Sequence, residues 1–91
     1  MPLPPGTLVT GARTSGNQLA VDALVPATLA QAAEFMTREL PASGFTISGS
    51  DAEQDEAEAS FAGNGVSGRF RLHGIANCGY AVTLTVSVSS A

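Results

Sequence analysis

With 91 residues, the chain is long enough for one domain and too short for two. Apolar residues make up 44% and charged residues 13%, a balance typical of a globular chain and not of a disordered one. The net charge is −4, and the basic side chains are four scattered arginines and one histidine. So few cations cannot neutralise a run of phosphates, so the composition argues against nucleic acid as a partner.

The chain starts with a proline-rich segment. Residues 1–6 are expected to form an extended lead, because each proline biases the preceding residue away from the helical region, and residues 7–91 a single domain. The lead lacks the basic and apolar regions of a signal peptide, and no apolar run approaches the ~20 residues of a transmembrane segment. If an export signal or anchor has been removed ahead of this lead, an extracytoplasmic or cell-envelope location is favoured.

Two strands are predicted next, at 7–13 and 18–25. The residues between them, 15–17, include a glycine and an asparagine, which tolerate the positive φ of a tight hairpin. In the second strand, apolar and other residues alternate with a period of two, which is typical of a strand with one buried face.

A helix follows Pro26. Thr28 and Gln31 fit a capping box at its start. Pro41 and Gly44 are stop signals, so the helix is expected to end near residue 40, or a turn later at residue 44. The apolar residues of this segment recur at helical spacing and form one stripe: Leu29, Ala32, Ala33, Met36 and Leu40.

Four further strands are predicted, at 45–48, 57–62, 67–73 and 80–89, separated by an acidic loop at 51–56, a turn at 63–65 and a loop at 76–79. The order β-β-α-β-β-β-β and the alternation of the strands predict an α+β fold, a two-layer sandwich with one helix on one face of an antiparallel sheet. The opposite, polar face is expected to carry Thr46, Ser48, Ser60, Arg69, Arg71, His73, Thr83, Thr85 and Ser87.

The Asn64-Gly65 dipeptide is the strongest hairpin signal. A two-residue turn there pairs residues whose numbers sum to 129. It sets Glu58 opposite Arg71 on the polar face and places Phe61 over Gly68 on the core face.

Motifs for catalysis or cofactor binding are weak. Alternate carboxylates at 51, 53 and 55 could ligate calcium, but Glu56 and Ala62 stand where an EF-hand needs glycine and glutamate, so a solvated acidic loop is expected and no metal site. The glycines form no phosphate-binding motif, and no cofactor is predicted. His73 and Cys78 are close enough in sequence to form a nucleophile pair, but no orienting residue or oxyanion-stabilising motif accompanies them. Cys78 is otherwise read as a small residue in a turn.

The polar face is the one feature with functional content. A flat surface of hydroxyls and cations could bind an anionic or sugar-like ligand or a protein. The candidate contact residues are Arg69, Arg71, His73, Thr83, Thr85 and Ser87.

The lead Leu3-Pro4-Pro5-Gly6, the strand hairpin and the segment 35–45 (Phe-Met-Thr-Arg-Glu-Leu-Pro-Ala-Ser-Gly-Phe) resemble small extracytoplasmic domains of actinobacterial lipoproteins of unknown function. The resemblance runs from about residue 3 to 88. It implies an extracytoplasmic location and carries over no functional residue, and the lipid-attachment cysteine of such proteins would precede Met1.

Three functions follow as hypotheses. The first is a non-enzymatic extracytoplasmic binding or interaction domain that contacts a protein or small polar ligand through the polar face. The second is a small enzyme or accessory subunit that uses His73 and nearby carboxylates. The third is a structural homodimer with paired strand edges or sheet faces.

Overall fold

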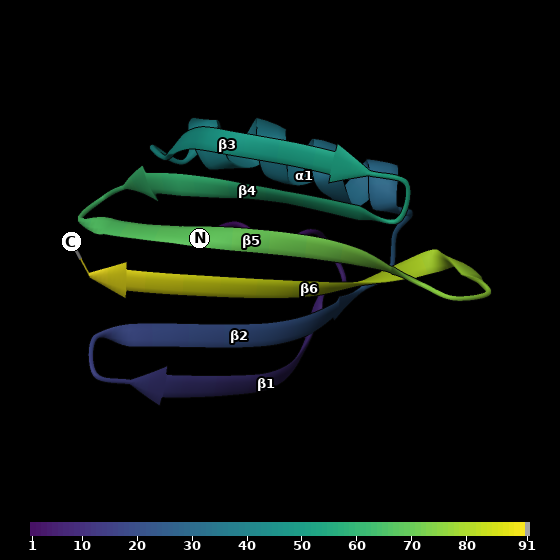
Figure 1. Ribbon diagram of the computed structural model, residues 1–91, viewed down its shortest axis with the longest axis horizontal. Coiled ribbons are helices and arrows are strands. Elements are labelled where there is room, and N and C mark those ends of the chain that lie inside the picture. Colours follow the sequence, from purple (N-terminus) through teal and green to yellow (C-terminus); the bar gives the residue numbers. More distant parts are fainter. Residues whose placement is uncertain (91) are drawn as a thin grey trace.

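The computed structural model, which describes residues 1–90, has one helix packed on a six-stranded antiparallel sheet (Figure 1). The fold class and the element order are therefore as the sequence predicts. The elements in chain order are β1 (Leu8–Ser15), β2 (Gln18–Val25), α1 (Leu29–Ala42), β3 (Thr46–Glu53), β4 (Glu56–Gly63), β5 (Val66–Ile75) and β6 (Cys78–Ser90).

The strands lie in the order β1-β2-β6-β5-β4-β3, and every neighbouring pair is antiparallel. The last strand thus lies between β2 and β5, and it joins the first hairpin to the rest of the sheet. Strands β1 and β3 are the two edges. Helix α1 lies behind β3 and β4 in Figure 1, and it contacts all strands from β3 to β6.

Helix α1 begins with the predicted capping box. The backbone N–H of Gln31 donates to Thr28 Oγ1 at 3.1 Å, and the backbone N–H of Thr28 donates to Gln31 Oε1 at 3.0 Å. The helix continues through Pro41 to Ala42, and Gly44, at φ +94°, leads the chain out of it. The helix therefore ends at Ala42, between the two predicted positions.

The core lies between α1 and the sheet. The helix contributes Ala32, Met36 and Leu40, all fully buried, and Leu29 and Ala33 are half-buried beside them. The sheet contributes alternate residues of its strands: Ala23, Val25, Ala57, Ala59, Phe61, Phe70, Leu72, Val82, Leu84 and Val86.

Residues 1–7 lie on the same side of the sheet as the helix. Pro4 is buried, and its carbonyl oxygen accepts a hydrogen bond from the Thr7 hydroxyl at 2.6 Å. Leu3 packs against the core, beside the core-facing residues Val21 and Val86. The lead therefore covers part of the sheet next to the helix.

The hairpin of β4 and β5 has the predicted register. Asn64 and Gly65 form its turn at φ +54° and +80°, and Glu58 pairs with Arg71. Phe61 pairs with Gly68 and covers it, since a Cβ built on that glycine would lie 2.7 Å from Phe61 Cζ.

The predicted acidic loop at 51–56 is wrong. Strand β3 continues to Glu53 and β4 begins at Glu56, so these residues form a hairpin with a tight turn at 54–55. A bulge interrupts the pairing between Ser48 and Asp51, and Gly49 takes a φ of +58° there. Ala52 is the one apolar residue from 51 to 56, so the segment lacks the repeated alternation that would have identified it as a strand.

The loop predicted at 76–79 is also shorter in the structure. Its turn is Ala76-Asn77, with Asn77 at φ +62°, and Cys78 is already in β6. Asparagine tolerates this left-handed conformation better than most residues, which explains how so tight a turn forms without glycine at that position.

Candidate functional site

The six residues predicted to form a contact surface lie on β5 and β6, on the sheet face that α1 does not cover. All are exposed except Thr85, which is half-buried. They form three directly opposed cross-strand pairs: Arg69 with Ser87, Arg71 with Thr85, and His73 with Thr83. The structure therefore brings all six together as one two-strand band.

Carboxylates on β4 pair with the arginines of this band. Arg69 Nη2 lies 2.6 Å from Glu58 Oε1, and Arg71 Nη2 lies 3.1 Å from Glu58 Oε2. Arg71 Nε also lies 2.8 Å from Glu56 Oε1. Hydrogen bonds from Arg69 and then Arg71 lower the pKa of the Glu58 carboxyl below its usual range.

These ion pairs change what the face can bind. Both guanidinium groups are already partnered, so an anionic ligand would have to compete with Glu58 and Glu56 for them. The two arginines are therefore better suited to orient a ligand by hydrogen bonding than to bind a free anion.

A further ion pair lies on the other side of the band, between β1 and β2. Arg13 Nη1 lies 2.6 Å from Asp22 Oδ2, and the Thr85 hydroxyl reaches Asp22 Oδ1 at 3.5 Å. The hydrogen bond from Arg13 is the main cause of the lowered pKa of Asp22. Sequence reasoning missed this pair, because a turn drawn over three residues, 15–17, did not define which residues of β1 and β2 lie opposite each other.

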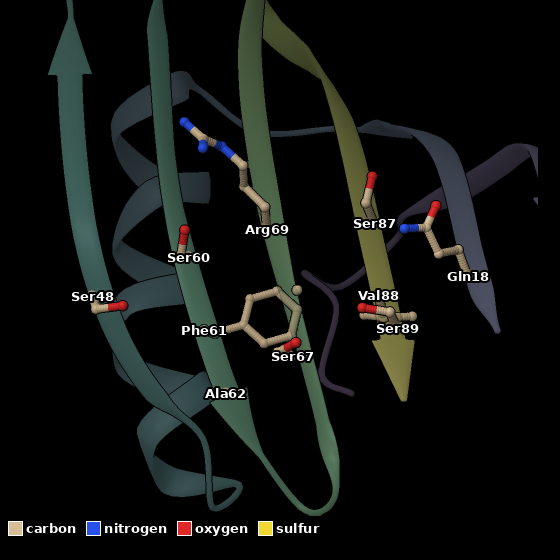
Figure 2. Close-up of a pocket in the computed structure, with 11 residues that line it drawn as sticks. Gln18, Ser48, Ser60, Phe61, Ala62, Ser67, Arg69, Ser87, Val88 and Ser89 are labelled. Atoms are coloured by element: carbon tan, nitrogen blue, oxygen red, sulfur yellow. The ribbon is translucent and has the colours of Figure 1, made fainter. Parts of the chain in front are cut away.

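At the end of the sheet nearest the β4–β5 turn, the polar face contains a shallow hollow of about 430 Å³ (Figure 2). We call it the serine hollow, because five serines from β3, β4, β5 and β6 line it: Ser48, Ser60, Ser67, Ser87 and Ser89. Gln18 and Arg69 add an amide and a guanidinium group at its sides. The side chains of Phe61 and Val88 belong to the core face, so these two residues meet the hollow from beneath.

Sequence analysis located Ser48, Ser60 and Ser87 on this face but did not single out a hollow. Ser67, Ser89 and Gln18 were missed as site residues. The sequence signal that could have identified them is the repeated occurrence of serine on the predicted strands. Only the register of the strands shows that these serines lie side by side.

Within residues 1–90, no hydrogen bond joins His73 to Cys78, so the two side chains are not arranged as a nucleophile pair. His73 Nδ1 lies 2.8 Å from the Gly74 carbonyl oxygen, and His73 Nε2 lies 3.8 Å from Asp55 Oδ2. Cys78 is exposed and not disulfide-bonded. Within the same residues, no three His, Cys, Asp or Glu side chains are grouped so that they could hold a metal ion.

No protein-family model matches this sequence, and comparisons with curated proteins and with solved structures found no significant match. Over residues 1–90, the chain also has no helix long and apolar enough to cross a bilayer. The geometry of the polar face is therefore the basis for the functional argument.

Proposed function

We propose that this chain is a non-enzymatic binding domain, and that its serine hollow binds a small neutral ligand rich in hydroxyl or amide groups. The observation that carries the proposal is the hollow itself. Five hydroxyls and one amide, each able to donate and accept hydrogen bonds, lie on four neighbouring strands and β2 and line about 430 Å³ of accessible space. That volume lies within the range of small-molecule sites.

The charge balance favours a neutral ligand over an anion. Arg69 is the one charged residue that lines the hollow, and Glu58 already holds it at 2.6 Å. A ligand that accepts a hydrogen bond from Arg69 without displacing Glu58 meets a smaller energetic cost than one that must break the ion pair.

A rigid sheet supports such a site. All five serines lie on paired strands, so their Cβ positions are held by the backbone hydrogen bonds of the sheet. Binding would then require little ordering of the protein, which reduces its entropic cost. An extracytoplasmic location remains part of the proposal, and it rests on the resemblance to lipoprotein domains alone.

The test is a titration of ¹⁵N-labelled protein with a panel of neutral mono- and disaccharides, followed by NMR. We expect amide shifts at Ser60, Ser67 and Ser87. The variant Ser87→Gln, which adds an uncharged side chain to the hollow, should abolish them. The matched control Thr83→Gln lies on the same face of β6 outside the hollow and should leave them unchanged.

Shifts spread evenly over the sheet, or equal binding by Ser87→Gln, would reject the serine hollow as the site. Shifts induced by the saccharides at His73 and Cys78 alone would instead favour a site at the other end of β5.

A further inference from the structure

The serine hollow meets a second depression of the polar face. This depression has a volume of about 230 Å³ and is lined by Arg69 and Arg71 of β5, by Thr85 and Ser87 of β6, and by Phe70 from beneath. It shares Arg69 and Ser87 with the hollow, and these two residues face each other across β5 and β6 (Figure 2). We call the hollow and this depression together the β6 groove.

Hydroxyl groups form the floor of the groove. Along β6, residues that point to the polar face alternate with valines and a leucine of the core face. Within the groove, the polar-face residues of this strand are Thr85, Ser87 and Ser89. Neighbouring members of the row are two residues apart, so the row extends about 13 Å along the strand. The serine hollow therefore holds only one end of an extended ligand that follows β6.

Ion pairs on β5 keep this floor accessible. Arg69 Nη2 lies 2.6 Å from Glu58 Oε1, and Arg71 Nε lies 2.8 Å from Glu56 Oε1. Both carboxylates belong to β4, so the two arginine side chains lean away from β6 and leave its hydroxyl row uncovered. The aliphatic parts of the arginines then form one wall of the groove.

Strand β2 forms the opposite wall. Ala20 is the direct partner of Ser87, and its methyl group is too short to cover that hydroxyl. Asp22 is the direct partner of Thr85, and it already accepts a hydrogen bond from Arg13 at 2.6 Å. The bond from the Thr85 hydroxyl to Asp22 is long, at 3.5 Å, so Thr85 keeps most of its hydrogen-bonding capacity for a ligand. The groove thus offers hydroxyls between charges that are neutralised in pairs.

We propose that the β6 groove binds an extended, neutral oligosaccharide, with one sugar in the serine hollow and a following sugar above Thr85. This inference rests on the proposed function of the hollow and adds the class of its ligand. Every ring of a saccharide carries hydroxyls that donate and accept, which matches a row of threonine and serine hydroxyls. An extended peptide would bind best to free backbone groups of a strand, but β5 and β6 each have a paired strand on both sides.

The test compares glucose with cellotriose, its straight-chain trimer, in NMR titrations of the ¹⁵N-labelled full chain. We expect the amide shifts caused by glucose to centre on Ser87, and those caused by cellotriose to extend to Thr85. Cellotriose should bind about two- to tenfold more tightly than its larger number of rings alone explains, which is the gain from one additional net hydrogen bond.

Variants at the far end of the groove isolate this gain. Thr85→Val keeps the shape of the side chain and removes its hydroxyl, so it should lower the ratio of the cellotriose and glucose affinities about two- to tenfold and leave glucose binding unchanged. The matched control Thr83→Val lies on the same face of β6 outside both depressions and should leave the ratio unchanged. Ser87→Gln, where the two depressions meet, should abolish binding of both probes.

The outcomes separate this inference from the proposed function. An affinity ratio that is the same in Thr85→Val and Thr83→Val, with amide shifts confined to the hollow, would overturn the extended groove and leave the hollow as a binding site. The groove would also be rejected if cellotriose caused no shifts while another saccharide bound the hollow. If no saccharide of the panel bound, the proposed function and this inference would both fail.

Discussion

Glu58 and Arg71 lie directly opposite each other on β4 and β5, and the same carboxylate also holds Arg69 at 2.6 Å. One glutamate thus accepts hydrogen bonds from two arginines that alternate along the neighbouring strand. The arrangement requires the Asn64-Gly65 register, because a shift by one residue would move Glu58 to the opposite face from both arginines.

The first prediction concerns the acidity of Glu58. Its pKa is lowered in the folded protein, so the ion pairs stabilise the fold. This contribution is complete when the pH is above the pKa that Glu58 has in the unfolded chain. It is lost as the pH falls through the pKa of Glu58 in the folded protein. We expect the side-chain ¹³Cδ titration of Glu58 to lie below that of glutamate in an unstructured peptide. Arg69→Gln should raise it, because it removes the largest cause of the shift. An ordinary titration curve in the wild-type protein would contradict the geometry of this pair.

The second prediction concerns the helix stripe. Met36 is fully buried against the sheet, so Met36→Ala should lower the free energy of unfolding by about 2–5 kcal/mol, and Met36→Asp should prevent folding. Leu29 is only half-buried, and Leu29→Ala should therefore cost less, about 1–2 kcal/mol. Urea denaturation measures both alanine variants. If Met36→Ala unfolded at the wild-type midpoint, the proposed core would be wrong.

The third prediction concerns the cap of α1. Thr28→Ala removes the acceptor of the Gln31 backbone N–H and should lower the free energy of unfolding by about 1 kcal/mol. Thr37→Ala is the matched control, since its exposed hydroxyl bonds only to carbonyl groups of the preceding turn. Equal losses in the two variants, measured by thermal unfolding, would show that the cap has no special role.

The helix and the β4–β5 hairpin were predictable because each has a local signal that agrees with its hydrophobic period. Thr28 and Gln31 mark the helix start, and Asn64-Gly65 sets a register that is apolar on one face and polar on the other. The hairpin at Glu53 was not predictable in this way. Its carboxylates oppose one another across the strands, which local propensity and pairing rules both disfavour.

The serine hollow was less accessible from the sequence for a related reason. It depends on residues from several strands, and their juxtaposition follows from the strand order, with β6 inserted between β2 and β5. Hydrophobic periodicity assigns residues to a face, but it does not say which strands are neighbours. The bulge in β3 also shifts the pairing of β3 with β4. Gly49 permits the positive φ found there, but a glycine in the sequence does not by itself predict a bulge.

The fourth prediction concerns divalent metals. Carboxylates 51, 53 and 55 are spread along a strand and its turn, and no metal-ligating cluster forms within residues 1–90. We expect neither calcium nor zinc at micromolar concentration to raise the melting temperature. A sharp rise in differential scanning fluorimetry that EDTA reverses would show a site that this geometry does not account for.

The last prediction contrasts two glycines on adjacent strands. A Cβ on Gly68 would clash with the Ser87 carbonyl oxygen and lie 2.7 Å from Phe61 Cζ. The carbonyl belongs to the backbone and cannot move without disturbing the pairing of β5 and β6. Gly68→Ala should therefore lower the free energy of unfolding by about 2 kcal/mol or more, a cost in the range of overpacked core positions.

Gly79, near the start of β6, has no atom within 4 Å of the corresponding Cβ position and does not take a positive φ. Gly79→Ala should be neutral or stabilise the chain by up to about 1 kcal/mol, because alanine restricts the unfolded state more than glycine does. Urea denaturation of both variants gives the comparison. If Gly68→Ala retained wild-type stability, the ring of Phe61 would not cover Gly68 and the sheet would have to pair differently there. The floor of the serine hollow would then differ as well, because both residues line it.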